Sequence, residues 1–339
     1  MNKLISYLFQ TNAFKICPEN KPFWYTSGKI GPYFMNAQFL YGSEEDANNL
    51  LTFIDSELEN ASKYNLPKDI FEKTLQQYNT NEIYKTTIDE FINFIHNNID
   101  VSEIDYVSGG ERRDWFFSNM VAHLLGKPHI TIHKDLSMIA SNSDFSENTD
   151  VTSLSEKNIL HVADLLNVAS SYIRAWVPAI RNLGGNIKWS LVAVDRQQGG
   201  SDALEKVGVK SYALINIDNS LFDKAFELGI INEIQLDTLY KFKENPDKAM
   251  RTFLIEHPEF IKDTLQSGGK NAKRAQLCID GNLYNLWTND TVKKMKKLDV
   301  AIPEKSKLAN IINTPFVCWR LSLTKDGKWE RQTAHSTSC

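Results

Sequence analysis

Between residues 105 and 218 the sequence alternates short apolar runs with helical segments, and this alternation constrains the fold more than any other feature. The runs DYVSGG, PHITIHK, NILHVADLL, IKWSLVAVDR and KSYALINID are typical of strands. The segments DWFFSNMVAHLLG and SSYIRAWVPAIRNLGG are typical of helices, and each ends at glycine. Strands and helices in alternation, joined by short links, predict an α/β fold built on a doubly wound parallel sheet.

Helices are predicted on both sides of this region in the sequence. Residues 43 to 98 are expected to be helical, beginning with Ser43 as the N-cap and Asp46 three residues later in an approximate capping box. From about residue 219 to residue 298 the sequence again has helical character.

Three further segments have no helical pattern. FWYTSGKIGPYFMNAQFLYGSEE predicts a bent hairpin, and FVCWRLSLTKDGKWERQTA predicts a terminal hairpin that turns at Asp326-Gly327. The polar stretch from residue 141 to residue 158 is expected to be a mobile surface loop. We therefore expect a core with an N-terminal hood (1–55 and 104–218), a helical insertion (56–103) and a mostly helical C-terminal extension ending in a hairpin (219–339).

Bulk composition excludes several classes of protein. The 38 Lys and Arg residues against 42 Asp and Glu give a formal charge of −4, without the basic surplus typical of nucleic-acid binders. The four cysteines are widely spaced and form no C-x-x-C pair, which disfavours a disulfide framework or a zinc site. No run approaches 18 apolar residues, and the N-terminus lacks the design of a signal peptide. We expect a cytoplasmic protein that binds neither nucleic acid nor membrane.

The segment ILHVADLLNVASSYIRAW is the first of three candidates for chemistry, because ligands of a doubly wound sheet bind at the carboxyl ends of its strands. Asp164 ends an apolar strand, where its carboxylate could accept hydrogen bonds from sugar hydroxyls. The loop that follows could cradle a phosphate with its amides and hydroxyls at the start of a helix. Alternatively, the two serines only cap that helix. The loop residues are Asn167, Val168, Ala169, Ser170 and Ser171.

The second candidate is SGGERRD, which also lies between a strand and a helix. Gly109 and Gly110 permit a tight turn, and Arg112 and Arg113 could grip phosphate oxygens with paired hydrogen bonds. Equally, both arginines could be solvated side chains at a helix start.

The third candidate is Arg196 in AVDRQQGG, which follows a buried strand. An arginine at this place can hold a carboxylate with two parallel hydrogen bonds. The alternative is an ion pair with Asp195 or Glu205.

In their order and spacing these segments resemble the type I phosphoribosyltransferases, and among them most closely orotate phosphoribosyltransferase. SGKIGPYFMN is similar to the family motif S-G-x-x-x-P-Y-F-x-N, whose aromatic residues form a wall of the orotate pocket. This implies orotate contacts for Phe34 and Met35. VDRQQGGSDALEKVGVKSYALI is similar to the V-D-R-x-x-G-G segment, which implies that Arg196 anchors the orotate carboxylate.

The same resemblance implies a site for phosphoribosyl pyrophosphate (PRPP). SGGERRD takes the place of the turn that contacts pyrophosphate, which implies PRPP contacts for Arg112 and Arg113. ITIHKD resembles the strand that carries a phosphate-binding basic pair, of which Lys134 is kept. ILHVADLLNVASS takes the place of the PRPP motif, with Asp164 for the ribose and residues 167–171 for the 5′-phosphate. Asp164 and Lys134 are the catalytic residues that the resemblance implies.

The resemblance implies transfer of the 5-phosphoribosyl group from PRPP to orotate, in a homodimer. The implied cofactor is Mg²⁺, held mainly by PRPP and by no protein side chain. Two alternatives stay open: a non-catalytic homologue that binds PRPP or a nucleotide for regulation, and a phosphoribosyltransferase for another base.

Several residues depart from the family pattern. Ala163 replaces the first of two acids, and the lysine before Ser27 is Thr26. The mobile catalytic loop usually brings a lysine and a histidine to the site, and this chain has neither there. The remaining departures are His133 for arginine, Asn167 for threonine, Ala169 for glycine, and Ser137 and Ile139 at the places of the loop basics.

Overall fold

The computed structural model describes residues 2–60 and 62–286, together with the backbone of residues 319–323 and 329–333. The chain divides into two compact units. The first comprises Met1–Phe23 and Gly31–Pro246, and the second comprises Trp24–Ile30 and Asp247–Cys339. The division into core, insertion and extension that the sequence suggested stays a prediction.

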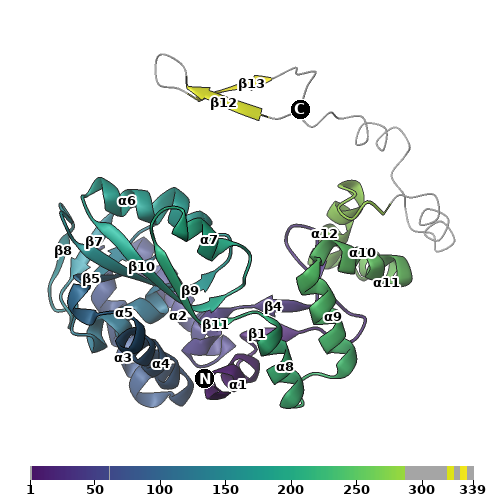
Figure 1. Ribbon diagram of the computed structural model, residues 1–339, viewed down its shortest axis with the longest axis horizontal. Helices are drawn as coiled ribbons and strands as arrows, with labels where there is room; N and C mark the ends of the chain where they lie inside the picture. The colour runs from purple at the N-terminus through teal and green to yellow at the C-terminus, as the bar shows by residue number, and fades with distance from the viewer. Residues whose placement is uncertain (1, 61, 287–318, 324–328, 334–339) are drawn as a thin grey trace. The chain divides into compact units, whose positions relative to one another are not determined.

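A seven-stranded sheet forms the centre of the first unit (Figure 1), in the order β11-β10-β9-β5-β6-β7-β8. The five strands from β11 to β6 run parallel, and β7 and β8 continue the sheet antiparallel. The strands are β5 (Tyr106–Gly110), β6 (His129–Ile132), β7 (Met138–Ser141), β8 (Asn148–Asp150), β9 (Asn158–Leu166), β10 (Asn186–Asp195) and β11 (Lys210–Asn216). The predicted parallel sheet is confirmed.

Helices cover both faces of the sheet. On one face lie α3 (Leu66–Thr80), α4 (Glu82–Asn98) and α5 (Trp115–Leu124), and on the other lie α6 (Val177–Asn182) and α7 (Gly200–Glu205) (Figure 1). Because β5 is flanked by β6 on one side and by β9 on the other, the winding reverses between β5 and β9. In a sheet of this type the ligand site lies where the winding reverses, outside the carboxyl ends of the strands.

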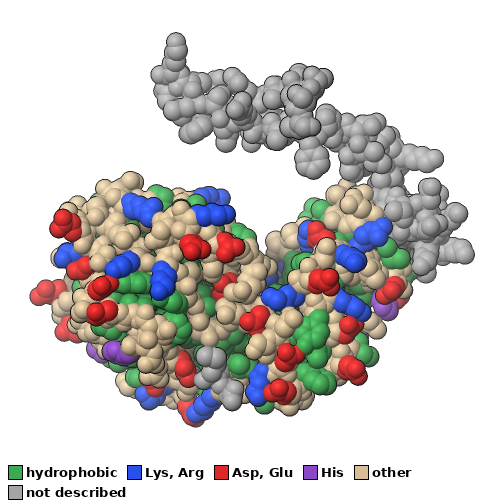
Figure 2. Space-filling model, viewed as in Figure 1, with side chains coloured by type: hydrophobic (Ala, Val, Ile, Leu, Met, Phe, Trp, Pro, Cys, Tyr) green, Lys and Arg blue, Asp and Glu red, His purple; other side chains and the backbone are tan. Residues whose placement is uncertain are grey.

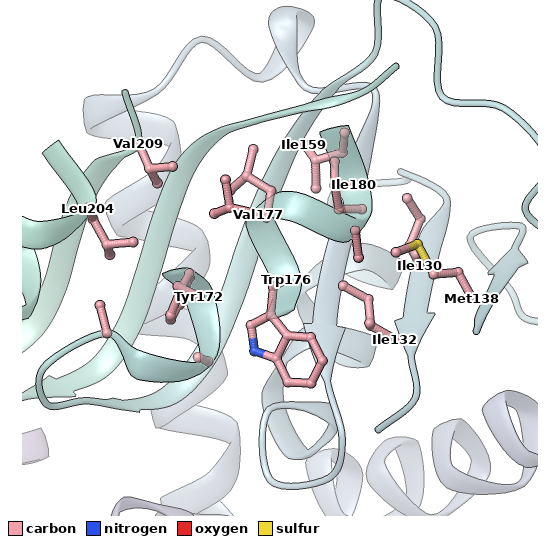
Figure 3. Packing of buried hydrophobic residues seen from close by; sticks show 14 of the residues in the cluster. Ile130, Ile132, Met138, Ile159, Tyr172, Trp176, Val177, Ile180, Leu204 and Val209 are labelled. Carbon is pink, nitrogen blue, oxygen red and sulfur yellow. The ribbon is translucent and has the colours of Figure 1, made fainter. Parts of the chain in front are cut away.

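Apolar side chains fix α6 and α7 to the sheet (Figure 3). Val177 and Ile180 of α6 pack with Ile159 of β9, and Leu204 of α7 belongs to the same buried cluster. A short π-helix, η3 (Tyr172–Trp176), leads into α6. Its two aromatic ends are buried in this cluster, which holds the preceding loop firmly against the strand ends.

The predicted helical region from residue 43 is confirmed. It consists of α2 (Glu44–Asn60), α3 and α4, followed by the short η2 (Val101–Glu103). The backbone N–H of Asp46 donates to Ser43 Oγ over 3.0 Å, so the serine caps α2 as expected.

The N-terminal hood packs on two C-terminal helices of the same unit. It comprises α1 (Asn2–Gln10), β1 (Phe14–Ile16), β4 (Tyr33–Met35) and η1 (Ala37–Tyr41), with β1 and β4 paired antiparallel. The Phe14 ring stacks on Phe222 of α8 (Asn219–Glu227) with centroids 6.4 Å apart. Tyr33 meets Phe242 of α9 (Glu233–Glu244) edge-on at 5.7 Å. The hairpin is therefore held from the side by helices that follow the sheet.

The second unit holds the tip of the predicted bent hairpin among three helices. The hairpin strands are β2 (Phe23–Trp24) and β3 (Ile30–Gly31), and the helices are α10 (Pro246–Glu256), α11 (Glu259–Ser267) and α12 (Gly269–Asp280). Trp24 Nε1–H donates to Thr264 Oγ1 over 3.1 Å, and the Tyr284 hydroxyl accepts from the Ile30 N–H over 2.8 Å. These bonds tie the tip to residues about 240 to 254 positions later.

Two other predictions concern the C-terminal part of the chain. The terminal hairpin is confirmed, because β12 (Trp319–Leu323) pairs antiparallel with β13 (Trp329–Thr333). Its turn at Asp326-Gly327 and the helical prediction for 287–298 lie outside the described residues.

The expectation of a loop from residue 141 to residue 158 is wrong in part. Residues 148–150 form β8, which pairs with β7, and Phe145 in the connecting turn is fully buried. An edge strand has only one neighbour and keeps one side in water, so it tolerates the polar sequence that resembled a loop.

Charged side chains of both signs are interspersed on the face of the molecule shown in Figure 2. Among the residues described, no helix has the length and apolar character needed to cross a membrane.

Candidate functional site

A cavity of about 400 Å³ opens at the carboxyl ends of β5 and β9, where the winding of the sheet reverses. It is lined by the turn after β5, by the end of β9 with the loop that follows, and by η3. The cavity brings together the predicted PRPP contacts Arg112, Arg113 and Asp164 with the whole loop at 167–171. Its full lining is Glu111, Arg112, Arg113, Asp114, Ala163, Asp164, Leu165, Leu166, Asn167, Val168, Ala169, Ser170, Ser171, Tyr172 and Trp176.

Asp164 reaches the cavity because β9 is longer than its neighbour β5. Pairing with β5 ends at His161, whereas pairing with β10 continues to Leu166. Asp164 is 7% exposed. Burial and the neighbouring Asp114 carboxylate raise the pKa of Asp164 to about 7, while Arg113 opposes the shift. The group therefore changes charge near neutral pH.

The loop from Asn167 to Ser171 has an unusual backbone conformation and is closely packed. Ala169 has φ of 55°, in the left-handed region where the resemblance expects glycine. A side chain costs about 1–2 kcal/mol there, so the surrounding structure must hold this conformation. Behind the loop, a Cβ on Gly200 would lie 2.4 Å from the Asn167 carbonyl oxygen. Ser171 makes no side-chain cap bond to η3, so the reading of this serine as a simple cap is not supported.

The two glycines that end β5 allow close packing around the cavity. A Cβ on Gly110 would lie 2.5 Å from the Trp176 ring, and one on Gly109 would lie 2.2 Å from Ser118 Oγ. The turn that follows β5 gives Arg112 and Arg113 different surroundings. Arg112 forms an ion pair with Asp55 of α2, and Arg113 is exposed beside Asp164.

Two residues at this site were not identified from the sequence. Asp114 lines the cavity and accepts a hydrogen bond from the Gly110 N–H over 3.0 Å. His161 Nε2 lies 3.3 Å from the same Asp114 oxygen. The available signal was a single polar ring in the apolar strand ILHVADLL, together with the acid that ends SGGERRD.

Lys134 lies in a different cavity, of about 300 Å³, which shares Glu111 with the first. The Lys134 N–H donates to Glu111 Oε2 over 2.8 Å, and Lys63 lines the same cavity. Burial lowers the pKa of His133, so this ring offers less positive charge than the arginine that the resemblance expects. Ile139 is fully buried in β7, so the segment at the place of the catalytic loop is a strand.

Arg196 lies at the end of β10, directly beside the cavity. Its backbone N–H donates to the carbonyl of Leu166, a cavity residue, over 2.9 Å. Its guanidinium carbon lies 5.9 Å from the centre of the Tyr33 ring. Arg196 Nε is buried and has no hydrogen-bond partner among the residues the structure describes.

The alternative partner of Arg196 is already occupied. The Asp195 carboxylate accepts hydrogen bonds from the Gln197 N–H over 2.7 Å and from the Ser201 hydroxyl over 2.8 Å. Within the described ranges, no ion pair joins Arg196 to Asp195 or to Glu205. The guanidinium is therefore not held by either acid.

The predicted base wall is strand β4, and Tyr33 is its contact with Arg196. Side chains alternate along a strand, so Met35 shares the side of Tyr33 whereas Phe34 points to the other side. Met35 is 9% exposed, and Phe34 packs on Phe23 with ring centroids 4.6 Å apart. Contact of Phe34 and Met35 with a base stays a prediction.

Comparison with known proteins finds relatives among the phosphoribosyltransferases. No family model matches the chain. Over 181 residues the chain is 29% identical to adenine phosphoribosyltransferase of Haemophilus ducreyi, covering 50% of this chain and 98% of that enzyme. Over 103 residues it is 32% identical to orotate phosphoribosyltransferase of Saccharolobus solfataricus, covering 30% of this chain and 46% of that enzyme. The chain is a homologue of the type I phosphoribosyltransferases.

Solved structures of this family are also similar to the chain. Orotate phosphoribosyltransferase of Francisella tularensis has a TM-score of 0.47 at 13% identity, covering 71% of this chain and 98% of that one. UMP synthase of Leishmania donovani has a TM-score of 0.47 at 14% identity, covering 71% of this chain and 41% of that one.

The cavity of this phosphoribosyltransferase homologue contains two carboxylates that could contribute to binding Mg²⁺. Among the described residues, no group of three or more His, Cys, Asp or Glu side chains is placed to hold a metal ion. Asp114 and Asp164 nevertheless line the cavity, and carboxylate oxygens are ligands that Mg²⁺ accepts alongside phosphates. The donor set therefore suits an ion that takes most of its ligands from a bound diphosphate.

Proposed function

We propose that the protein transfers the 5-phosphoribosyl group from PRPP to a ring nitrogen of orotate, giving orotidine 5′-phosphate and pyrophosphate. The observation that carries this proposal is the position of Arg196. A guanidinium whose buried Nε has no hydrogen-bond partner among the described residues stands beside a cavity suited to a sugar phosphate. A fixed arginine of this kind suits a carboxylate, which orotate has and the other common pyrimidine bases lack.

The cavity offers a place for each part of PRPP. The amides and hydroxyls of residues 167–171 suit the 5′-phosphate, and Asp164 at the end of β9 suits the ribose. Arg113 is free of ion pairs among the described residues and suits the pyrophosphate. Arg112 is paired with Asp55, but an ion pair this exposed is worth only about 0–1 kcal/mol, so pyrophosphate can compete for the arginine.

The reaction breaks the bond between C1′ of the ribose and a pyrophosphate oxygen, which leaves with the bonding electrons. A ring nitrogen of orotate forms the new bond to C1′, and the proton that this nitrogen carried passes to water. Positive charge from Arg112 and Arg113 stabilises the departing anion, which is the main contribution a protein makes to chemistry of this kind. Mg²⁺ bound to the diphosphate supplies further positive charge to the leaving group. Lys134, in the neighbouring cavity, is the proposed third cation.

Orotate is proposed to lie between β4 and Arg196. Tyr33 and Met35 face the same side of β4, and the Arg196 guanidinium lies against Tyr33, so these three residues are the proposed walls of the base subsite. Because the Arg196 backbone is bonded to Leu166, this subsite adjoins the ribose position. In this proposal the base and C1′ lie within reach of each other.

A specific observation favours each alternative. The match to adenine phosphoribosyltransferase spans nearly all of that enzyme, which favours another base. Ala163 and the burial of Ile139 remove an acid and the place of a catalytic loop, which favours a non-catalytic PRPP-binding protein.

A panel of bases separates these functions. We expect wild-type protein with PRPP and Mg²⁺ to consume orotate and to use uracil at least about 100-fold more slowly, because uracil leaves the Arg196 guanidinium unpaired. Rates of base consumption, measured by absorbance, give the comparison. Faster use of adenine than of orotate would support transfer to a purine. Equal rates with orotate and uracil would remove orotate from the assignment.

A further inference from the structure

Asp114 stands at a helix start but does not act as a cap. It is the N-cap residue of α5, where an aspartate ordinarily accepts a hydrogen bond from an amide of the first turn. Its side chain makes no cap bond to α5. Instead, Oδ2 accepts from the Gly110 N–H over 3.0 Å, and the carboxylate lines the cavity. The side chain is therefore directed away from its own helix and into the site.

The Asp114 carboxylate is in contact with the buried side chain of His161. The imidazole is fully buried in β9, between the rings of Tyr172 at 4.8 Å and Trp176 at 6.5 Å. Its Nε2 lies 3.3 Å from Asp114 Oδ2, and its Nδ1 lies 2.9 Å from Ser108 Oγ. An ionised carboxylate only accepts, so Nε2 carries the proton and Nδ1 accepts from the Ser108 hydroxyl. This chain of bonds fixes the orientation of Asp114.

Asp114 and Asp164 are neighbours on one wall of the cavity. The Asp164 N–H lies 3.4 Å from Asp114 Oδ1, and the charge of Asp114 contributes to the raised pKa of Asp164. Asp114 accepts hydrogen bonds from up to three groups, which fixes the position of its carboxylate. Its side chain is 14% exposed, so it is open to a ligand on the cavity side.

We infer that Asp114 is a second carboxylate for the ribose of the donor, accepting from one of its two ring hydroxyls while Asp164 binds the other, with His161 as the positioning residue for Asp114. This inference rests on the proposed function. A vicinal diol presents two O–H donors on adjacent carbons, and two neighbouring carboxyl groups can each accept from one of them. Position 163, directly before Asp164 in the strand, carries only a methyl group and cannot supply the second acceptor.

The test measures how much each ribose hydroxyl contributes to binding. Calorimetry compares ribose 5-phosphate with its 2-deoxy and 3-deoxy analogues, using wild type and Asp114→Asn. In wild type, removal of either hydroxyl should weaken binding about ten- to a hundredfold. Asp114→Asn should bind ribose 5-phosphate more weakly and become insensitive, within about threefold, to the removal of one hydroxyl. Retention of both hydroxyl effects in Asp114→Asn would overturn the inference.

Two controls separate this outcome from loss of the fold or of the function. Asp105→Asn removes a carboxylate that accepts the Asn158 N–H over 2.8 Å at the amino ends of β5 and β9, opposite to the cavity, and should change no affinity. Unchanged binding of inorganic phosphate by Asp114→Asn shows that the loop cradle is intact. Failure of wild type to bind any of the three sugar phosphates would contradict the proposed function itself, and the inference with it.

Two variants of His161 test whether this residue positions Asp114. His161→Gln keeps an N–H donor for Asp114, whereas His161→Met has similar volume and no donor. The methionine variant should lose the same hydroxyl effect as Asp114→Asn, and the glutamine variant should keep most of it. Binding by His161→Met with the wild-type pattern would show that His161 does not position Asp114.

Discussion

Replacing Arg196 with alanine is expected to lower kcat/KM for orotate by about 10²–10³-fold, the loss typical of a buried charge pair with one partner removed. Affinity for PRPP should stay within about threefold, because the side chain contacts Tyr33 and not the residues proposed to bind the donor. Initial rates with orotate and calorimetry with PRPP measure the two effects separately. The split between them distinguishes a base contact from a general loss of structure.

Two further variants sharpen this prediction. Arg196→Lys should recover only part of the activity, since an ammonium group cannot form two parallel hydrogen bonds to a carboxylate. Arg181→Ala is the matched control, because Arg181 bonds to the Val207 carbonyl outside the cavity lining. An Arg196→Ala protein as active on orotate as wild type would show that Arg196 is not the base anchor.

Replacing Asp164 with asparagine should have opposite effects on binding and on stability. Loss of a charged acceptor for the ribose should weaken PRPP binding about ten- to a hundredfold, and binding of the free base much less. Calorimetry with PRPP and with orotate gives this comparison, with Asp105→Asn as control. A variant that binds PRPP as tightly as wild type would exclude Asp164 as the ribose ligand.

The stability effect follows from the raised pKa of Asp164. Its ordinary value is 3.8, and burial with the nearby Asp114 charge raises it to about 7 in the folded protein. Between these values the folded protein holds a proton that the unfolded chain has lost, so this group favours folding most below about pH 4 and least above pH 7. Asparagine carries no charge at any pH. The free energy of unfolding of the variant should therefore rise relative to that of wild type as pH rises, and the difference should reach about 1–4 kcal/mol above pH 7.

Thermal unfolding of both proteins between pH 4.5 and pH 8.5, without ligand, measures this gain. The difference in Tm should be small at the acid end and should grow through neutral pH. A difference that does not change with pH would contradict the buried, titrating carboxyl group.

The strands that are buried on both faces could be predicted from the sequence because their apolar runs are continuous. The run NILHVADLL coincides with β9, since a central strand of a parallel sheet needs apolar residues on both sides. The edge strand β8 could not be predicted in this way, because it has no apolar run. The residues of β8 are Asn, Thr and Asp, and only their pairing with β7 makes them a strand.

The residues of the candidate site could be predicted from the sequence where they follow one strand. Asp164 and the loop after it are contiguous, so the end of an apolar run located them. Asp114 and His161 are 47 residues apart and meet only because β5 and β9 are neighbours in the sheet. An acid before a helix resembles a cap, and only the structure shows that its side chain turns the other way.

The base wall shows a similar limit. The motif at residues 27–36 includes strand β4, and the residue of this strand that contacts Arg196 is Tyr33, which the sequence did not single out. Which side chains of a short strand face a site depends on its pairing, here of Phe14 with Met35 and of Ile16 with Tyr33. A shift by one residue would reverse the faces, and the sequence alone does not fix that register.

Phosphorus NMR of the wild-type protein with PRPP, Mg²⁺ and orotate tests the central claim most directly. The signals of PRPP should disappear only when orotate is present, and pyrophosphate and a nucleotide monophosphate should form in equal amounts. PRPP that persists with orotate and with every other base would contradict phosphoribosyl transfer, as would its breakdown to pyrophosphate without a base.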